Sequence, residues 1–141
     1  MDESKISSFI NNKQSPFPSF RTLCPAECHS IYECFFQKVG SCEIDASVSD
    51  IFQNNGQFIE QFNALDDSFN IQILLSYLRK ELDTICINWD EFESIDQMKF
   101  SDFCDYFDDI WYPIAEDMIL FPLNMSFLIM IRHDGALFMI E

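Results

Sequence analysis

The sequence is poor in glycine and in basic residues. Of 141 residues, 3 are glycine and 8 are lysine or arginine, against 24 aspartates and glutamates. No Gly-x-Gly-x-x-Gly or Walker-type loop is present, so the glycine-rich backbone that cradles phosphate in nucleotide-binding proteins is missing. Binding to nucleic acid needs lysine and arginine at the phosphates. With a formal net charge of -16, we expect neither nucleic acid nor a membrane surface as a ligand.

Long apolar segments are missing as well. The chain does not start with a basic region followed by an apolar stretch, so we expect no signal peptide. The longest apolar run, Phe127 to Ile131, is far too short to span a bilayer. The 6 cysteines occur in a chain large enough to fold without disulfides. We therefore expect reduced thiols and a cytoplasmic protein.

The composition favours one domain with an aromatic core. Hydrophobic residues make up 48% of the chain and include 16 phenylalanines, enough to bury a sizeable core. Residues 1–20 are rich in serine and asparagine, and Pro16 and Pro18 prevent a helix around Phe17. We expect an irregular arm over residues 1–20 and a single globular domain over residues 21–141.

Hydrophobic periodicity predicts helices first and strands last. Thr22 is a candidate cap for a helix that carries Pro25 in its first turns and stops at Gly40. Apolar residues at helical spacing also predict helices over residues 50–62, 71–85 and 101–111, and Asn88 is a candidate cap for another short helix. Short apolar runs predict strands over residues 118–121, 126–131 and 136–140, with a tight turn at His133-Asp134-Gly135. The predicted fold class is α+β, with N-terminal helices packed on a C-terminal three-stranded antiparallel sheet. Ala136–Ile140 and Phe127–Ile131 would also supply an apolar edge through which two copies could pair.

The segment from Asp83 to Asp117 carries eleven carboxylates and one base, Lys99, together with eight aromatic residues. Disordered acidic tails are poor in aromatics, so this segment should fold and hold its charges at a surface. Such a surface attracts a basic protein and accelerates its association. Aromatic side chains among the acids are candidate anchors. The predicted partner-binding set is Asp90, Glu93, Asp102, Asp105, Tyr106, Asp109, Trp111, Tyr112, Glu116 and Asp117.

Chemical sites are less well supported. The potential zinc ligands Cys24, Cys28, His29, Cys34 and Cys42 fall within 19 residues, but only the first pair has suitable spacing, and buried thiols are the better explanation of the pattern. The chain has 2 histidines, and neither is placed to activate a cysteine nucleophile. Adjacent carboxylates such as Asp108 and Asp109 lack basic groups that would grip a substrate. We expect no catalytic residue, no metal and no cofactor.

Two resemblances bear on function. The run Tyr106-Phe107-Asp108-Asp109-Ile110-Trp111-Tyr112-Pro113, followed by Glu116-Asp117, the apolar run to Ile131 and His133-Asp134-Gly135, resembles the C-terminal half of small bacterial immunity proteins. Those proteins are encoded beside polymorphic or contact-dependent toxins and neutralise them by direct binding. Asn88-Trp89-Asp90 with Phe92 is similar to a short motif in barstar-type ribonuclease inhibitors, whose strands are parallel, unlike the hairpin predicted here.

Both resemblances imply a stoichiometric inhibitor rather than an enzyme. Its target would be a basic toxin, with a nuclease as the expected class, because nuclease grooves are basic and an acidic face can cover them. Two alternatives have the same charge. One is a nucleic-acid mimic that inhibits a DNA-binding or defence protein, and the other is a non-catalytic acidic adaptor domain.

Overall fold

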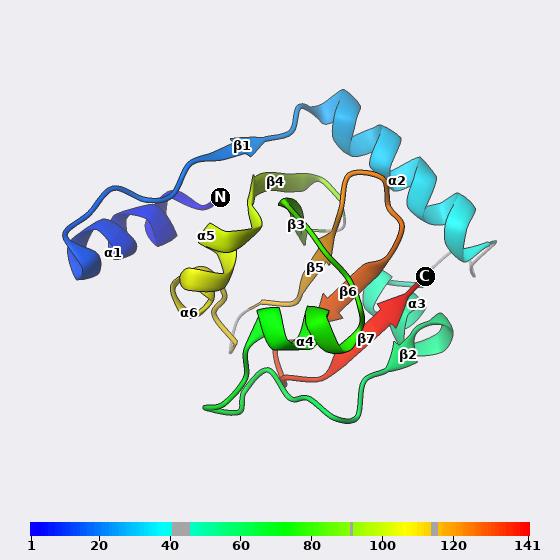
Figure 1. Ribbon diagram of the computed structural model, residues 1–141. Helices are drawn as coiled ribbons and strands as arrows, with labels where there is room; N and C mark the ends of the chain where they lie inside the picture. Colours follow the sequence, from blue (N-terminus) through cyan, green and yellow to red (C-terminus); the bar gives the residue numbers. More distant parts are fainter. Residues whose placement is uncertain (41–45, 91, 114–115) are drawn as a thin grey trace.

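The computed structural model describes residues 1–40, 46–90, 92–113 and 116–141. Within this part of the chain, seven strands form one antiparallel sheet in the order β1-β4-β3-β5-β6-β7-β2 (Figure 1). The strands are β1 (Phe20–Thr22), β2 (Gln57–Phe58), β3 (Thr84–Asp90), β4 (Ser94–Lys99), β5 (Met118–Phe121), β6 (Leu128–Ile131) and β7 (Leu137–Ile140).

Helices and strands are interleaved along the chain. The helices are α1 (Glu3–Lys13), α2 (Pro25–Val39), α3 (Val48–Asn55), α4 (Ile71–Tyr77), α5 (Phe100–Asp105) and α6 (Phe107–Ile110). The mixture of helix and strand confirms the predicted class at its coarse level. The prediction of three strands is wrong, because the sheet has four more, and the prediction that helices come first is wrong, because α4, α5 and α6 lie between strands.

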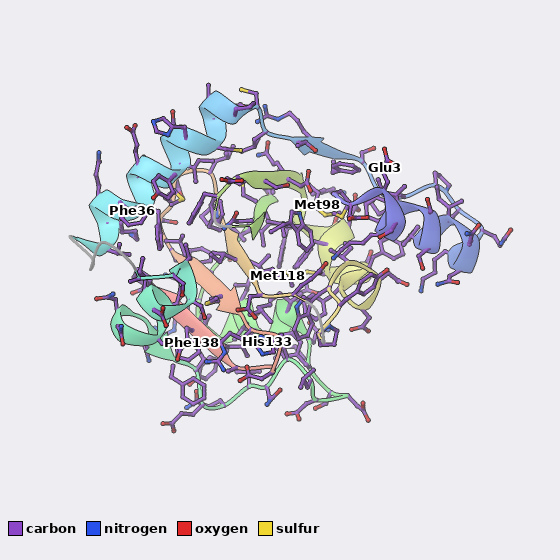
Figure 2. The ribbon with its side chains drawn as sticks, turned by 180° about the vertical axis from the view of Figure 1, so that it is seen from behind. Glu3, Phe36, Met98, Met118, His133 and Phe138 are labelled. Carbon is purple, nitrogen blue, oxygen red and sulfur yellow. The ribbon has the colours of Figure 1, made fainter. Side chains whose placement is uncertain are left out.

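The sheet is covered by helices on both faces. Alternate side chains of a strand point to opposite faces, and two separate apolar clusters follow this alternation. What we call the α4 face carries Ile85, Ile87, Met98, Met118, Leu120, Ile129, Ile131, Leu137 and Met139, packed against α4, α5 and α6. The α2 face carries Cys86, Ile95, Ile119, Phe121, Leu128, Met130 and Ile140, packed against α2 and α3. Figure 2 shows the side chains that fill the space between the sheet and its helices.

Residues 3–13 form a helix, so the expectation of an irregular arm over residues 1–20 is wrong there. The Asp2 side chain caps α1 by accepting the Ser4 N–H at 2.6 Å, a strongly preferred way to begin a helix. One turn apart, Lys5 and Phe9 are both buried against the rest of the protein. The polar sequence obscured this helix because only 2 of its 11 residues, Lys5 and Phe9, are buried.

The predicted helices are confirmed to different extents. Helix α2 is capped by Cys24 rather than by Thr22, which ends strand β1, and it stops as predicted at Gly40, whose φ of +78° suits glycine. The helix predicted over residues 71–85 ends at Tyr77, and Asn88 lies in strand β3 rather than at the start of a helix. The acidic helix predicted over residues 101–111 is divided into α5 and α6. The helix predicted over residues 50–62 is α3, which ends at Asn55.

The C-terminal meander is confirmed, but it lies inside the sheet. Strand β6 pairs with β5 and β7, and β7 pairs with β2 on its other side. The runs Phe127–Ile131 and Ala136–Ile140 therefore do not supply the free edge proposed for pairing two copies. The edges of the sheet are the short strands β1 and β2.

Candidate partner-binding site

Helices α5 and α6 turn their apolar residues inward and their carboxylates outward. Phe103, Phe107 and Ile110 are buried in the cluster on the α4 face. Asp105 and Asp108 are exposed. Phe103 and Phe107 are four residues apart, on one side of the helical segment, with ring centroids 5.7 Å apart. These helices thus have an apolar side in the core and acidic residues facing solvent.

Some carboxylates of this region have cationic partners and others do not. Asp109 pairs with Lys13 at 3.0 Å, Glu116 pairs with Lys5, and the Asp117 carboxylate lies 2.7 Å from the His133 ring. Among the residues that the structure describes, Asp102, Asp105 and Asp108 form no ion pair; Asp102 accepts a hydrogen bond from the Ser101 hydroxyl at 3.4 Å. These three charges are available to a partner.

A hollow lies beside Asp108. Its volume is about 380 Å³, and three acids line it: Asp66, Asp67 and Asp108. The remaining lining comes from Ala64, Leu65, Phe69, Trp111 and Pro113. Asp66 and Asp67 lie in the loop before α4, far in sequence from α6, and were absent from the predicted set. The combination of apolar walls and three carboxylates suits the long stem and charged head of a lysine or arginine side chain.

The predicted aromatic anchors are mostly engaged within the protein. Trp111 is 2% exposed, and its indole N–H donates to the Glu116 carbonyl at 2.9 Å, so it is part of the core and not a surface anchor. Tyr106 is half-buried and packs edge-on against Phe9 of α1, with ring centroids 5.0 Å apart. Tyr112 is also half-buried.

Two predicted contact residues lie elsewhere. Asp90 ends strand β3. Glu93 follows it in the β3–β4 hairpin and is exposed beside α2, where it lines a hollow of about 480 Å³ with Pro25, Cys28, His29, Tyr32 and Phe92. The structure therefore brings Asp102, Asp105 and Asp109 together on α5 and α6, but it does not join Glu93 to them.

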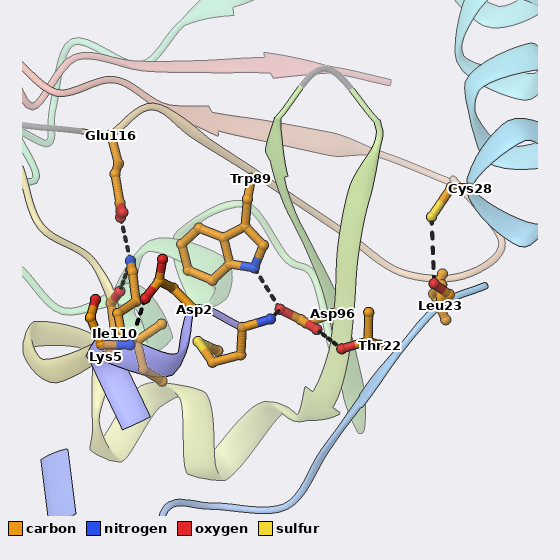
Figure 3. Close-up of polar contacts among 11 residues, drawn as sticks. Asp2, Lys5, Thr22, Leu23, Cys28, Trp89, Asp96, Ile110 and Glu116 are labelled. Atoms are coloured by element: carbon orange, nitrogen blue, oxygen red, sulfur yellow. Dashed lines mark hydrogen bonds and ion pairs between the residues drawn. The ribbon is translucent and has the colours of Figure 1, made fainter. Parts of the chain in front are cut away.

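A buried cluster around Asp96 was not predicted. Asp96 of β4 is fully buried and receives three donors: the α-ammonium of Met1, the Thr22 hydroxyl at 2.6 Å and the Trp89 indole N–H at 2.8 Å (Figure 3). A buried carboxylate is stable only when its charge is paired and its lone pairs are satisfied. The three donors meet this requirement and connect the start of the chain to strands β1, β3 and β4.

Lys5 lies next to this cluster in an aromatic and acidic setting. Its ammonium donates to the Ile110 carbonyl at 2.6 Å and to Glu116, and it lies 4.2 Å from the Trp89 ring centroid and 4.7 Å from that of Tyr112. Burial lowers the pKa of Lys5, and the hydrogen bond to Glu116 opposes this effect. We call Trp89, Ile110, Tyr112 and Glu116 the ammonium cage.

Two sequence patterns hint that Asp96 and Lys5 are buried. Asp96 and Met98 are two residues apart in a strand, so they face the same side of the sheet, and Met98 belongs to the core. Lys5 and Phe9 are similarly four residues apart and share one side of a helix. Neither pattern reveals that these side chains meet residues about a hundred positions away in sequence.

The potential zinc ligands do not converge in the described part of the chain. Cys28 is buried, whereas Cys24 and Cys34 are exposed, and His29 pairs with Glu33 at 3.5 Å. Burial raises the pKa of Cys28, as expected for a thiol packed in a core. No group of three or more potential metal ligands occurs among the described residues, and Cys42 lies outside them.

Comparisons with protein-family models, curated proteins and solved structures found no match to this chain. No helix within the described residues has the length and apolar character needed to cross a membrane. The arguments about function below therefore rest on the residues and their geometry.

Proposed function

We propose that this protein is a stoichiometric, immunity-type inhibitor that neutralises a basic toxin by covering its substrate groove. A nuclease is the class of toxin we expect, because its groove must be basic to hold phosphate. The surface that binds it would comprise α5, α6 and the loop at Asp66 and Asp67. The observation that carries this proposal is the set of carboxylates on that surface that form no ion pair with any cation in the described part of the chain.

The local charge arrangement supports a role beyond solubility. Asp102, Asp105 and Asp108 lie within two short consecutive helices, and like charges at such spacing disfavour the helix. Lys5 and Lys13 neutralise Glu116 and Asp109 nearby, whereas none of the described cations pairs with the other three. A basic partner would relieve this repulsion on binding and would be attracted over a distance.

The test begins with affinity capture from native cell lysate at low and high salt, followed by mass spectrometry. The tag belongs at the C-terminus, because the α-ammonium of Met1 is buried against Asp96. The captured protein is then assayed for its own activity as the inhibitor is added. We expect a basic protein, released by salt, whose activity falls to zero at a one-to-one ratio. Capture without inhibition at that ratio would contradict the proposal.

Charge reversal then locates the surface. We expect Asp102→Lys, Asp105→Lys and Asp108→Lys together to slow association about tenfold or more at low salt, because steering depends on complementary charge. Glu33→Lys is the matched control for Asp105→Lys, because both sites are exposed and both changes alter the net charge equally. Glu33 lies on α2, across the sheet from the proposed surface. An equal effect of the two single reversals would show that only net charge matters.

A further inference from the structure

The side chain of Lys5 is unusual among the described lysines. It is 3% exposed, whereas that of Lys13, on the same helix, is 44% exposed. A lysine is almost never buried this deeply without partners. The chain has only 8 basic residues, yet one of them is inserted between two aromatic rings and a carboxylate.

The ammonium cage holds the Lys5 ammonium through four groups and three kinds of interaction. The Trp89 and Tyr112 rings lie 4.2 and 4.7 Å from the Lys5 ammonium, well within the range at which an aromatic ring attracts a cation. Glu116 supplies the opposite charge, and the Ile110 carbonyl accepts an N–H at 2.6 Å. All four cage residues belong to the segment from β3 to the start of β5, whereas the lysine comes from α1. The cage and its occupant are thus parts of separate segments.

The cage borders open space. A hollow of about 300 Å³ lies beside it, lined by Met1, Asp2, Lys5, Trp89, Ser94 and Glu116. Glu116 retains 28% exposure of its side chain. Figure 3 shows Lys5 and Glu116 on one side of the Trp89 ring and Asp96 at its indole nitrogen. A second cation approaching from solvent would therefore meet the cage at Glu116.

We propose that the ammonium cage is a lysine-binding site, occupied here by Lys5, and that a lysine of the basic partner replaces Lys5 when the complex forms. The identity of the partner rests on the proposed function, whereas the binding of an ammonium group rests on the cage residues alone. Replacement exchanges one ammonium for another, so the cage keeps its cation and Glu116 keeps its counter-charge. The cost of burying the ion is then similar before and after the exchange. The cage adjoins α6, which also lines the acidic hollow through Asp108.

The test uses n-butylammonium, which has the four carbons and the ammonium of a lysine side chain. Lys5→Ala should empty the cage, and n-butylammonium should then bind saturably and shift the NMR resonance of the Trp89 indole N–H. In the unchanged protein the affinity should be about tenfold lower or worse, because tethered Lys5 competes at a high effective concentration. Lys13→Ala is the matched control on the same helix and should behave like the unchanged protein. Equal binding by all three proteins, or no binding by folded Lys5→Ala, would overturn the proposal.

A second measurement covers the case in which Lys5→Ala does not fold. The unchanged protein is titrated with n-butylammonium chloride and, separately, with sodium chloride at equal ionic strength. Replacement of Lys5 should release α1 and raise the amide hydrogen exchange of α1 with the first salt only. Equal exchange in the two salts would refute replacement. Neither experiment uses a toxin. A negative result for n-butylammonium therefore leaves the inhibitor proposal untouched, and failure of the inhibitor proposal leaves the cation binding by the cage untouched.

Discussion

The two faces of the sheet are built by different means. The α2 face is filled by aromatic and aliphatic side chains, and its one buried polar group among the described residues is Asn88, whose side chain accepts the Phe92 N–H at 2.8 Å. The α4 face has an apolar cluster of similar kind, but at one end it holds the buried charges of Lys5 and Asp96.

The apolar α2 face is suited to stabilising the fold, whereas the charged end of the α4 face is suited to recognition. Apolar burial is the main source of folding stability, whereas buried ion pairs contribute little net stability because desolvation offsets their attraction. The α4 face nevertheless holds such pairs, and its outer helices carry Asp102, Asp105 and Asp108, which form no ion pair within the residues that the structure describes. Departures from a purely apolar core are expected at functional sites, so the α4 face is where we place the binding function.

The largest expected effect is on the α2 face. Phe35 is fully buried and contacts Phe92, Phe36 and Phe52, with ring centroids 4.8, 5.5 and 6.0 Å away. Phe35→Ala should lower the free energy of unfolding by about 3–5 kcal/mol, because it leaves a cavity. Urea denaturation would measure the change. Phe58→Ala is the control: that ring is 49% exposed, so its loss should cost far less. Equal losses for the two variants would contradict the assignment of this core.

The charged end of the α4 face should give the next largest effect. Asp96→Asn removes the negative charge from a carboxylate that receives the Met1 ammonium, Thr22 and Trp89. Breaking a buried pair leaves an uncompensated ion and costs about 3 kcal/mol or more. Urea denaturation again measures it, with Glu93→Gln in the exposed hairpin as control. A loss below about 1 kcal/mol, typical of an exposed pair, would show that Asp96 is hydrated rather than buried.

The same two faces show what sequence could predict. Strands β5 and β6 are buried at every position, and uninterrupted apolar runs identified both. Strand β3 was missed because Leu82 and Ile85 continue the helical spacing of α4, although Arg79 adopts a φ of +56° that ends the helix. Asn88 does bond a backbone N–H, as predicted for a cap, but the bond closes a hairpin. A side chain that accepts a backbone N–H can cap a helix or close a hairpin. The tertiary contacts of β3 therefore determine that Asn88 lies in a hairpin.

The candidate site was predictable only in its local part. The acidic outer side of α5 follows from helical spacing around Phe103, and the structure confirms it. Asp66 and Asp67, by contrast, meet Asp108 across about forty positions, and Lys5 meets Glu116 across 111. Pairings over such separations depend on the order of strands in the sheet, which apolar periodicity does not specify. The sequence therefore predicted that this surface is acidic, but it did not predict which residues form it.

The smallest expected effect distinguishes Lys5 from Asp96 at the same end of the α4 face. Lys5→Met keeps an unbranched stem but removes the charge and leaves Glu116 without its cation. Because the Glu116 side chain retains 28% exposure, water can solvate this carboxylate, and we expect a loss of about 1 kcal/mol or less near neutral pH, as for an exposed pair. The pKa of Lys5 lies below its ordinary value of 10.5, so between the folded and unfolded pKa values the unfolded chain binds more protons. The stability of the unchanged protein should therefore rise relative to Lys5→Met as pH increases through that window. Urea denaturation of both proteins between pH 7 and pH 10.5 measures the difference, and a relative stability that falls with pH would show that Lys5 gains more from Glu116 than it loses by burial.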